Sequence, residues 1–195
     1  MSRSSAHSLR FGLRLGLACL LGGLAQGAAA QSTEFRYYDV PLREGEDLRS
    51  ALNRASPIRE AGDTFHARTD WSAQADYRWW KESDGRCRIT NSHVTLAIVI
   101  TLPRLAADAP AATRARFDSY LVRLREHEDG HARVARETAF AIESRIRSLP
   151  EAKSCEALEA SAEAARKALM DEAREREKRY DRDTQHGATQ GARLD

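Results

Sequence analysis

The hydrophobic pattern of the chain changes its period between residues 103 and 109, and this change constrains the fold more than any other feature. From Phe65 to Trp79, fifteen residues, the odd positions are mostly apolar and the even positions are polar. Such alternation predicts a β-strand with one buried face, and a strand of this length is expected to bend. From Ala109 to Leu149, apolar residues instead recur every three or four positions, which predicts a long amphipathic helix.

Shorter signals predict the other strands. Residues 34–42 are expected to form a short strand, followed by a short helix that ends before Pro57. Residues 87–102 follow an Asp-Gly turn and are expected to form a second long strand, whose apolar second half is typical of the centre of a sheet. Pro103 is expected to end that strand because it cannot donate to a ladder.

The second half of the chain predicts a helical hairpin that closes near residue 150. Pro150 stops the first helix, and Ser154 is a suitable N-cap for a second helix that runs to about Tyr180. Residues 181–195 show no periodicity, so we expect a disordered terminus there. Together these elements predict an α+β fold, in which a mostly antiparallel N-terminal sheet packs on a C-terminal helical hairpin.

The first thirty residues have the layout of a secretory signal peptide. They carry three arginines and no acidic residue, an apolar run from Leu15 to Leu24, and the small residues Ala28 to Ala30. We expect cleavage after Ala30, a single mature domain over residues 31–195, and a periplasmic or secreted protein. No later apolar segment is long enough to span a bilayer, so no stable membrane anchor is expected after cleavage.

Charge and cysteine content narrow the classes of function. Removing residues 1–30 lowers the 31 basic side chains to 28, against 29 acidic ones, so no basic excess indicates a nucleic-acid partner. Cys87 and Cys155 are the two cysteines of the mature chain. In an exported protein, a pair of this kind is expected to form a disulfide, here one that ties the strand-rich half to the helical half.

The stretch HEDGH carries the chemistry. His127 and His131 lie four residues apart within the predicted helix, with Glu128 directly after the first. Residues at this spacing are rotated by only about 40° and separated by about 6 Å, so both imidazoles can reach one zinc ion. Glu128 then points beside the metal, where it can take a proton from water. The alternative is a pair of core histidines held by hydrogen bonds.

A third zinc ligand is required, and spacing leaves two sources open. In an antiparallel hairpin, Glu172 or Glu175 of the second helix comes level with His127 and His131. His186, six residues beyond the expected end of that helix, can also reach the metal if the chain folds back. Imidazole suits zinc at least as well as carboxylate does.

The chain resembles the family of predicted secreted zinc-dependent proteases, catalogued among bacterial domains of unknown function. The resemblance extends from about Tyr37 to Gly191 and rests on YYDV at 37–40, TDW at 69–71, Cys87, TLP at 101–103, HEDGH at 127–131, Cys155 and YDRDTQHGATQG at 180–191. It implies a zincin-like metallopeptidase. Within it the T-x-H-G pattern is as much a signature as H-E-x-x-H, which favours His186 as the third ligand.

The sequence therefore predicts a zinc metallopeptidase that hydrolyses peptide or protein substrates in the cell envelope or outside the cell, with one zinc ion and Glu128 as the catalytic base. The alternative is a non-catalytic zinc-binding module that interacts with an envelope component. Three residues of the tail are candidates for supporting roles. Asp181 or Asp183 is a candidate to orient a metal-bound histidine, and Tyr180 is a candidate to stabilise an oxyanion.

Other polar and aromatic residues have simpler interpretations. His66 and His93 occupy polar positions of predicted strands and are expected to be solvated. Trp71 and Trp79 share the apolar face of the alternating strand, so we expect them in the core. Trp80 breaks the alternation and is expected to be exposed.

Overall fold

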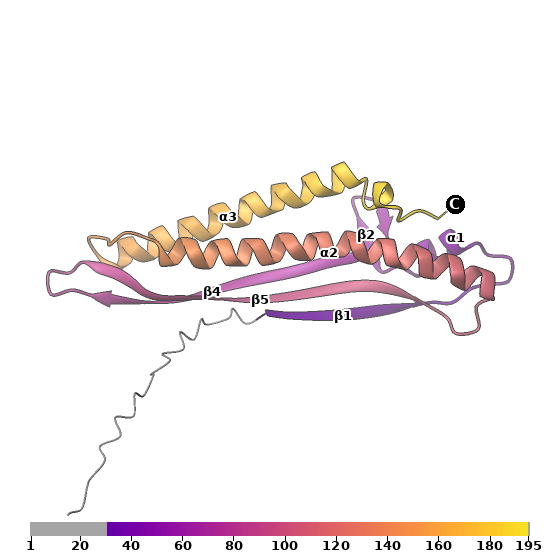
Figure 1. Ribbon diagram of the computed structural model, residues 1–195, viewed down its shortest axis with the longest axis horizontal. Coiled ribbons are helices and arrows are strands. Elements are labelled where there is room, and N and C mark those ends of the chain that lie inside the picture. The colour runs from indigo at the N-terminus through magenta and orange to yellow at the C-terminus, as the bar shows by residue number, and fades with distance from the viewer. Residues whose placement is uncertain (1–30, 195) are drawn as a thin grey trace, which may run out of the picture.

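The computed structural model describes residues 31–194, so the expected signal peptide lies outside the described residues. The chain has an α+β fold, with an N-terminal sheet and C-terminal helices (Figure 1). Its elements are β1 (Gln31–Val40), α1 (Leu48–Ala55), β2 (Ile58–Glu60), β3 (Asp63–Phe65), β4 (Arg68–Lys81), β5 (Cys87–Leu105), α2 (Ala111–Arg147), α3 (Cys155–Thr184) and the 3-10 turn η1 (Ala188–Gln190). None of the described helices is long and apolar enough to cross a membrane.

The main sheet has the strand order β1-β5-β4, so β5 is central as expected from its apolar run. β4 pairs with β5 antiparallel, whereas β1 pairs with β5 in parallel, and β2 and β3 form a separate antiparallel pair. Pro103 does not end β5, contrary to expectation; the strand continues to Leu105. The pairing with β4 stops at Thr101, so among the described strands Pro103 pairs with β1 alone and its missing N–H can lie on the free side.

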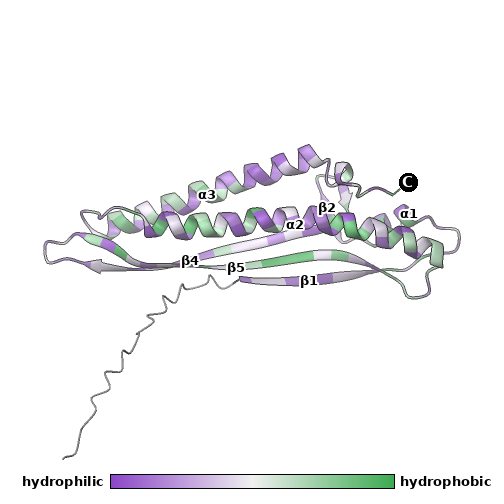
Figure 2. Ribbon diagram, viewed as in Figure 1, coloured by the Kyte–Doolittle hydropathy of each residue, from purple (hydrophilic) through white to green (hydrophobic). Residues whose placement is uncertain are grey.

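The hydrophobic core lies between the sheet and α2, which runs along one face of it (Figures 1 and 2). β5 contributes alternate side chains that are at most 1% exposed: Val94, Leu96, Ile98, Ile100 and Leu102. Ile142 and Ile146 of α2 pack into the same cluster. Burial of each such side chain stabilises the fold by about 1.5–3 kcal/mol. This packing fixes the position of α2 on the sheet.

The alternating strand behaves as expected except at its end. Trp71 packs against the core, and Trp80 is 57% exposed. Trp79, expected in the core, is 41% exposed instead, and its indole N–H donates to Glu159 at 3.0 Å. The register of β4 against β5 shifts between Arg78 and Trp79, and a shift of this kind breaks the alternation of faces.

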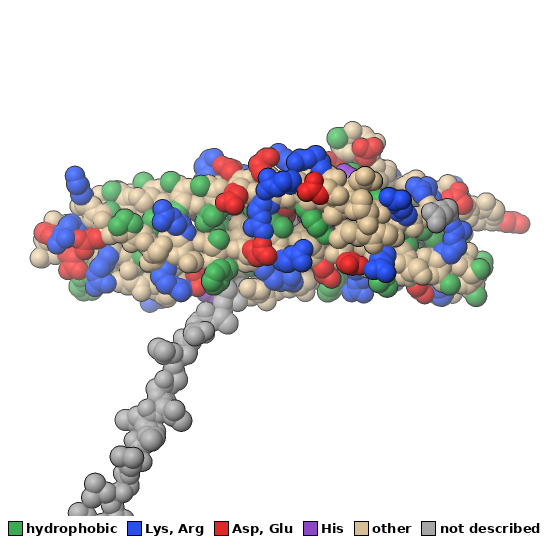
Figure 3. Space-filling view, turned by 45° about the horizontal axis from the view of Figure 1, so that its top comes forward, with side chains coloured by type: hydrophobic (Ala, Val, Ile, Leu, Met, Phe, Trp, Pro, Cys, Tyr) green, Lys and Arg blue, Asp and Glu red, His purple; other side chains and the backbone are tan. Residues whose placement is uncertain are grey.

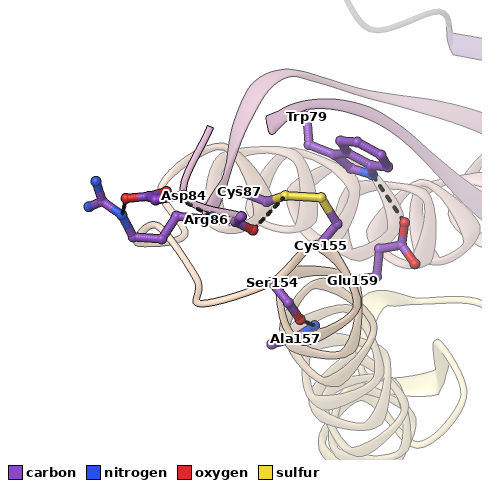
Figure 4. Close-up of a disulfide and its surroundings, with 9 residues drawn as sticks. Trp79, Asp84, Arg86, Cys87, Ser154, Cys155, Ala157 and Glu159 are labelled. Atoms are coloured by element: carbon purple, nitrogen blue, oxygen red, sulfur yellow. Dashed lines mark hydrogen bonds and ion pairs between the residues drawn. A yellow bond between two sulfur atoms is a disulfide. The ribbon is translucent and has the colours of Figure 1, made fainter. Parts of the chain in front are cut away.

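A disulfide joins Cys87, the first residue of β5, to Cys155, the first residue of α3 (Figure 4). The predicted pairing is confirmed. Cys87 also exchanges both backbone hydrogen bonds with Ala152, at 3.0 and 2.9 Å. The expected N-cap is in place as well, since the Ser154 hydroxyl accepts from the Ala157 N–H at 3.2 Å.

α3 lies against α2 and is charged along its outer side. Figure 3 shows basic and acidic side chains intermixed on that face, and several pair at helical spacing, such as Arg166 with Glu163 and Lys167 with Asp171. Each exposed ion pair of this kind contributes little to the stability of the fold. The mixture of charges is typical of a solvated helix surface and not of a binding patch with charges of one sign.

The C-terminal segment is ordered, contrary to expectation. α3 continues four residues past Tyr180 to Thr184, and the chain then turns back through Gln185, His186 and Gly187, all with positive φ. Leu194 is only 6% exposed and belongs to the main core cluster. These contacts are distant in sequence, so no local periodicity could have indicated them.

Candidate metal centre

The histidines of the HEDGH stretch lie in the middle of α2 on its inward face. His127 and Glu128 are each 4% exposed, and His131 is mostly buried. The two imidazole rings meet edge to face, with their centroids 4.9 Å apart. Buried polar groups of this kind need partners; α3 and the C-terminal segment supply those of the histidines, and β4 supplies that of Glu128.

Asp181 of α3 lies between the histidines. One of its carboxylate oxygens, Oδ1, is 3.0 Å from His131 Nε2 and 3.2 Å from His127 Nε2. One donor atom from each of these three residues lies within 4.8 Å of the other two. Two imidazole nitrogens and one carboxylate oxygen are a donor set that zinc accepts, so these side chains fit a metal ion.

The charges in this group stabilise one another. Burial alone would raise the pKa of Asp181, but hydrogen bonds from His127 and His131 outweigh burial and hold that pKa below its usual value. Burial alone would lower the pKa of His131, but the hydrogen bond and charge of Asp181 outweigh it and raise that pKa. Asp181 therefore favours a positive charge at this point, whether a proton or a metal ion provides it.

His186 lies next to the same carboxylate. Its Nδ1 is 3.6 Å from Asp181 Oδ1, and its ring centroid is 5.0 Å from that of Phe65. Its φ of 52°, like the φ of 50° at Gln185, is in the left-handed region, which costs a non-glycine residue about 1 kcal/mol or more. The turn thus brings His186 over the site, but Asp181 is the closer of the two to His127 and His131.

The remaining candidates divide between the site and the surface. Tyr180 stacks on His127, and its hydroxyl lies 3.2 Å from the His127 backbone oxygen. It does not line the cavity that Glu128 lines, so it is not placed to stabilise an oxyanion there. Glu172 and Asp183 are exposed, and Glu175 is exposed and paired with Lys178 at 2.8 Å. The structure does not bring these three carboxylates to the histidines.

Glu128 is held by Thr69 of β4. The Thr69 hydroxyl donates to Glu128 Oε2 at 2.7 Å and lies 3.2 Å from the backbone oxygen of the same residue. Burial raises the pKa of Glu128, while the Thr69 hydrogen bond and the nearby histidines oppose that rise. Sequence reasoning missed this role of Thr69. The signal was its polar side chain among the apolar odd positions of the alternating strand.

A second group of residues encloses the other side of His127. The Tyr180 ring stacks on the His127 ring at 5.0 Å with an interplanar angle of 9°. Gln190 of η1 places its Oε1 3.0 Å from His127 Nδ1, and a β-carbon added to Gly187 would lie 3.1 Å from the His127 β-carbon. Gln190 was also missed, although it lies within the TQHGATQG stretch that marked the family resemblance.

The histidines open onto a cleft of about 660 Å³ between α2, the C-terminal segment and the β2–β3 hairpin. His66 lines it, and the expectation that this residue is solvated is wrong. Its Nδ1 is 2.8 Å from the Tyr120 hydroxyl, and its Nε2 is 2.8 Å from Asn53 Oδ1. Burial, with the charges of Arg49 and Arg59, lowers the pKa of His66 to about 4. His93 lies on β5 and does not line the cleft.

Comparison with known proteins gives a family for the chain. Residues 35–187 match the family described as bacterial protein of unknown function (DUF922). The chain belongs to this family. The matched DUF922 segment includes His127, Glu128, His131, Asp181 and His186 and ends before Gln190. No curated protein and no solved structure matches the chain.

Proposed function

We propose that the protein is a zincin-like metallopeptidase that hydrolyses peptide bonds, with zinc held by His127, His131 and Asp181. The convergence of both Nε2 atoms on one Asp181 oxygen supports this proposal most directly. The spacing of 3.0 and 3.2 Å is close to what donors about 2.0–2.1 Å from a common tetrahedral ion require. This ligand set replaces His186, which the family resemblance favoured, with the carboxylate that lies closer.

Zinc bound here would supply a Lewis acid and lower the pKa of water to near neutrality. Glu128 is the residue that takes the proton. It lies beside the two histidines on the same helix, and Thr69 fixes its carboxylate through Oε2. A carboxylate held in this way can accept a proton and deliver it to a leaving amine without reorientation.

The substrate is proposed to be a peptide or protein of the cell envelope or the exterior, in keeping with the expected signal peptide. β4 is an edge strand, and its first residues, Arg68 and Thr69, line the cleft. An extended peptide that pairs with this edge would pass beside Glu128. The volume of about 660 Å³ accommodates a few side chains of such a segment.

The test is a Glu128→Gln variant assayed for zinc content and for cleavage of a diverse peptide library. The variant should keep zinc, because Glu128 is not a ligand, and lose at least about 100-fold in cleavage rate. Glu126→Gln is the matched control, because Glu126 is exposed and pairs with Arg123 at 3.0 Å. Equal cleavage by the wild type and Glu128→Gln would contradict catalysis through Glu128.

A second function has one observation in its favour. His186 Nδ1 lies 3.6 Å from Asp181 Oδ1, so it is near enough to offer a fourth protein donor after a small movement. A site closed by four protein ligands stabilises a fold and leaves no position for water. In that case the protein is a zinc-binding interaction module. His186→Ala would then weaken zinc binding as strongly as loss of Asp181, whereas the peptidase proposal expects a much smaller effect.

A further inference from the structure

The chain of hydrogen bonds behind His127 fixes where its protons lie. The Tyr180 hydroxyl lies 3.2 Å from the backbone oxygen of His127 and 3.5 Å from Gln190 Oε1, and we assign its proton to the nearer of these two acceptors. With its single proton used, the Tyr180 oxygen accepts from the Gln190 amide N–H, at 3.0 Å. The amide group of Gln190 therefore presents its carbonyl oxygen, and not its N–H, to His127 Nδ1.

A carbonyl oxygen facing Nδ1 requires the proton of a neutral imidazole to be on that nitrogen. In that form Nε2 carries a lone pair that can bind a cation in place of the hydrogen bond to Asp181, and Nε2 is the atom that faces Asp181 and the other histidine. The stacked Tyr180 ring holds the imidazole plane in the same orientation. The arrangement presets His127 to donate to a cation through Nε2.

We infer that Gln190 is a positioning residue for the metal centre: it selects the Nδ1-protonated form of His127 through its side-chain carbonyl and so raises the affinity for zinc. This inference rests on the proposed zinc site. It assigns a role to the C-terminal turn beyond the residues of the DUF922 match, which end at 187.

The experiment is a competition titration of zinc against a chromophoric chelator, on the purified wild type and two variants of similar side-chain size. Gln190→Leu fills the same space but removes the acceptor, and zinc affinity should fall about 10- to 100-fold. Gln190→Glu keeps an acceptor for Nδ1–H and should stay within about threefold of the wild type. Gln74→Leu, the same change at an exposed position of β4, is the matched control.

If Gln190 acted through packing alone, Gln190→Leu should keep more zinc affinity than Gln190→Glu, because leucine is tolerated in a half-buried position better than an added charge. Thermal unfolding of the metal-free variants measures that packing contribution separately. Tyr180→Phe provides a second test, because it removes the hydroxyl that orients the Gln190 amide and should cost part of the same affinity.

Gln190→Leu with wild-type zinc affinity, or Gln190→Glu as weak as Gln190→Leu, would overturn the inference while the zinc site itself stood. Failure of the wild type to bind zinc in the same titration would remove the proposed function, and the role of Gln190 with it.

Discussion

The Tyr180 hydroxyl lies directly over Gly130, so close that a β-carbon at residue 130 would fall 2.0 Å from the hydroxyl oxygen. Gly130 is the fourth residue of the HEDGH stretch, in the middle of a 37-residue helix where glycine costs about 1 kcal/mol relative to alanine. The space it leaves is filled by the residue that stacks on His127. The glycine is therefore explained by the support of the site rather than by the helix.

Gly130→Ala should lower the free energy of unfolding by about 1 kcal/mol, because displacing the held Tyr180 ring outweighs the gain in helix propensity. Denaturant unfolding of the metal-free protein measures it. In a Tyr180→Ala background the space is open, and the same substitution should instead stabilise, by up to about 1 kcal/mol. A destabilisation of equal size in both backgrounds would refute the contact as the cause.

Replacing Cys87 and Cys155 together by alanine should lower the free energy of unfolding by about 4 kcal/mol, since the bridge closes a loop with a sequence separation of 68 residues. Urea unfolding of the double variant and of the oxidised wild type measures the difference. The reduced wild type serves as the control and should resemble the variant. Identical midpoints for oxidised and reduced protein would show that the bridge does not stabilise the fold.

Protonation of His66 should destabilise the protein below neutral pH. Its pKa is lowered to about 4 in the folded chain, from 6.5 for an ordinary histidine. As the pH falls from 6.5 to 4, the unfolded chain takes up a proton that the folded chain does not, so stability is lost across this window and not above it. The loss is on the order of 2 kcal/mol, reduced by the partial exposure of the ring.

A His66→Gln variant does not titrate and isolates this contribution. The difference in unfolding free energy between the wild type and the variant should be constant above pH 6.5. As the pH falls from 6.5 to 4, the wild type should lose stability relative to the variant, and below pH 4 the difference should again be constant. A difference that does not change between pH 7 and pH 4 would contradict the burial of a neutral His66.

Asp181→Asn should weaken zinc binding by about 100-fold or more, because the amide lacks the charge that the two histidines and the metal share. Asp183→Asn is the matched control, since this exposed carboxylate lies two residues further along the same helix. Isothermal titration with zinc distinguishes them. Equal affinity in the two variants would rule out Asp181 as a ligand and return His186 to that position.

Much of the fold could be predicted from the sequence because its elements are long and strongly periodic. The alternation in β4 and the three-to-four spacing in α2 each continue over several turns or pleats, and the disulfide follows from the two cysteines of a chain that is expected to be exported. The parallel pairing of β1 could not be predicted, because the residues of a strand give no signal of the direction in which it pairs.

The candidate site likewise has a part that could be predicted from the sequence and a part that could not. His127, Glu128 and His131 are fixed by spacing on one helix, and their placement needs no tertiary information. Asp181 and Gln190 reach the histidines because of how α3 packs along α2 and how the chain then turns, and local spacing indicates neither. Counting along an antiparallel hairpin placed Glu172 and Glu175 level with the histidines, whereas in the structure Asp181, further along α3, lies beside them.

The zinc content of the purified protein tests the central claim most directly. After zinc loading and removal of weakly held metal, elemental analysis should find one zinc per chain in the wild type and none in a variant with His127 and His131 both replaced by alanine. Wild-type protein with no more zinc than that variant would contradict the metal centre, and the proposed peptidase activity with it.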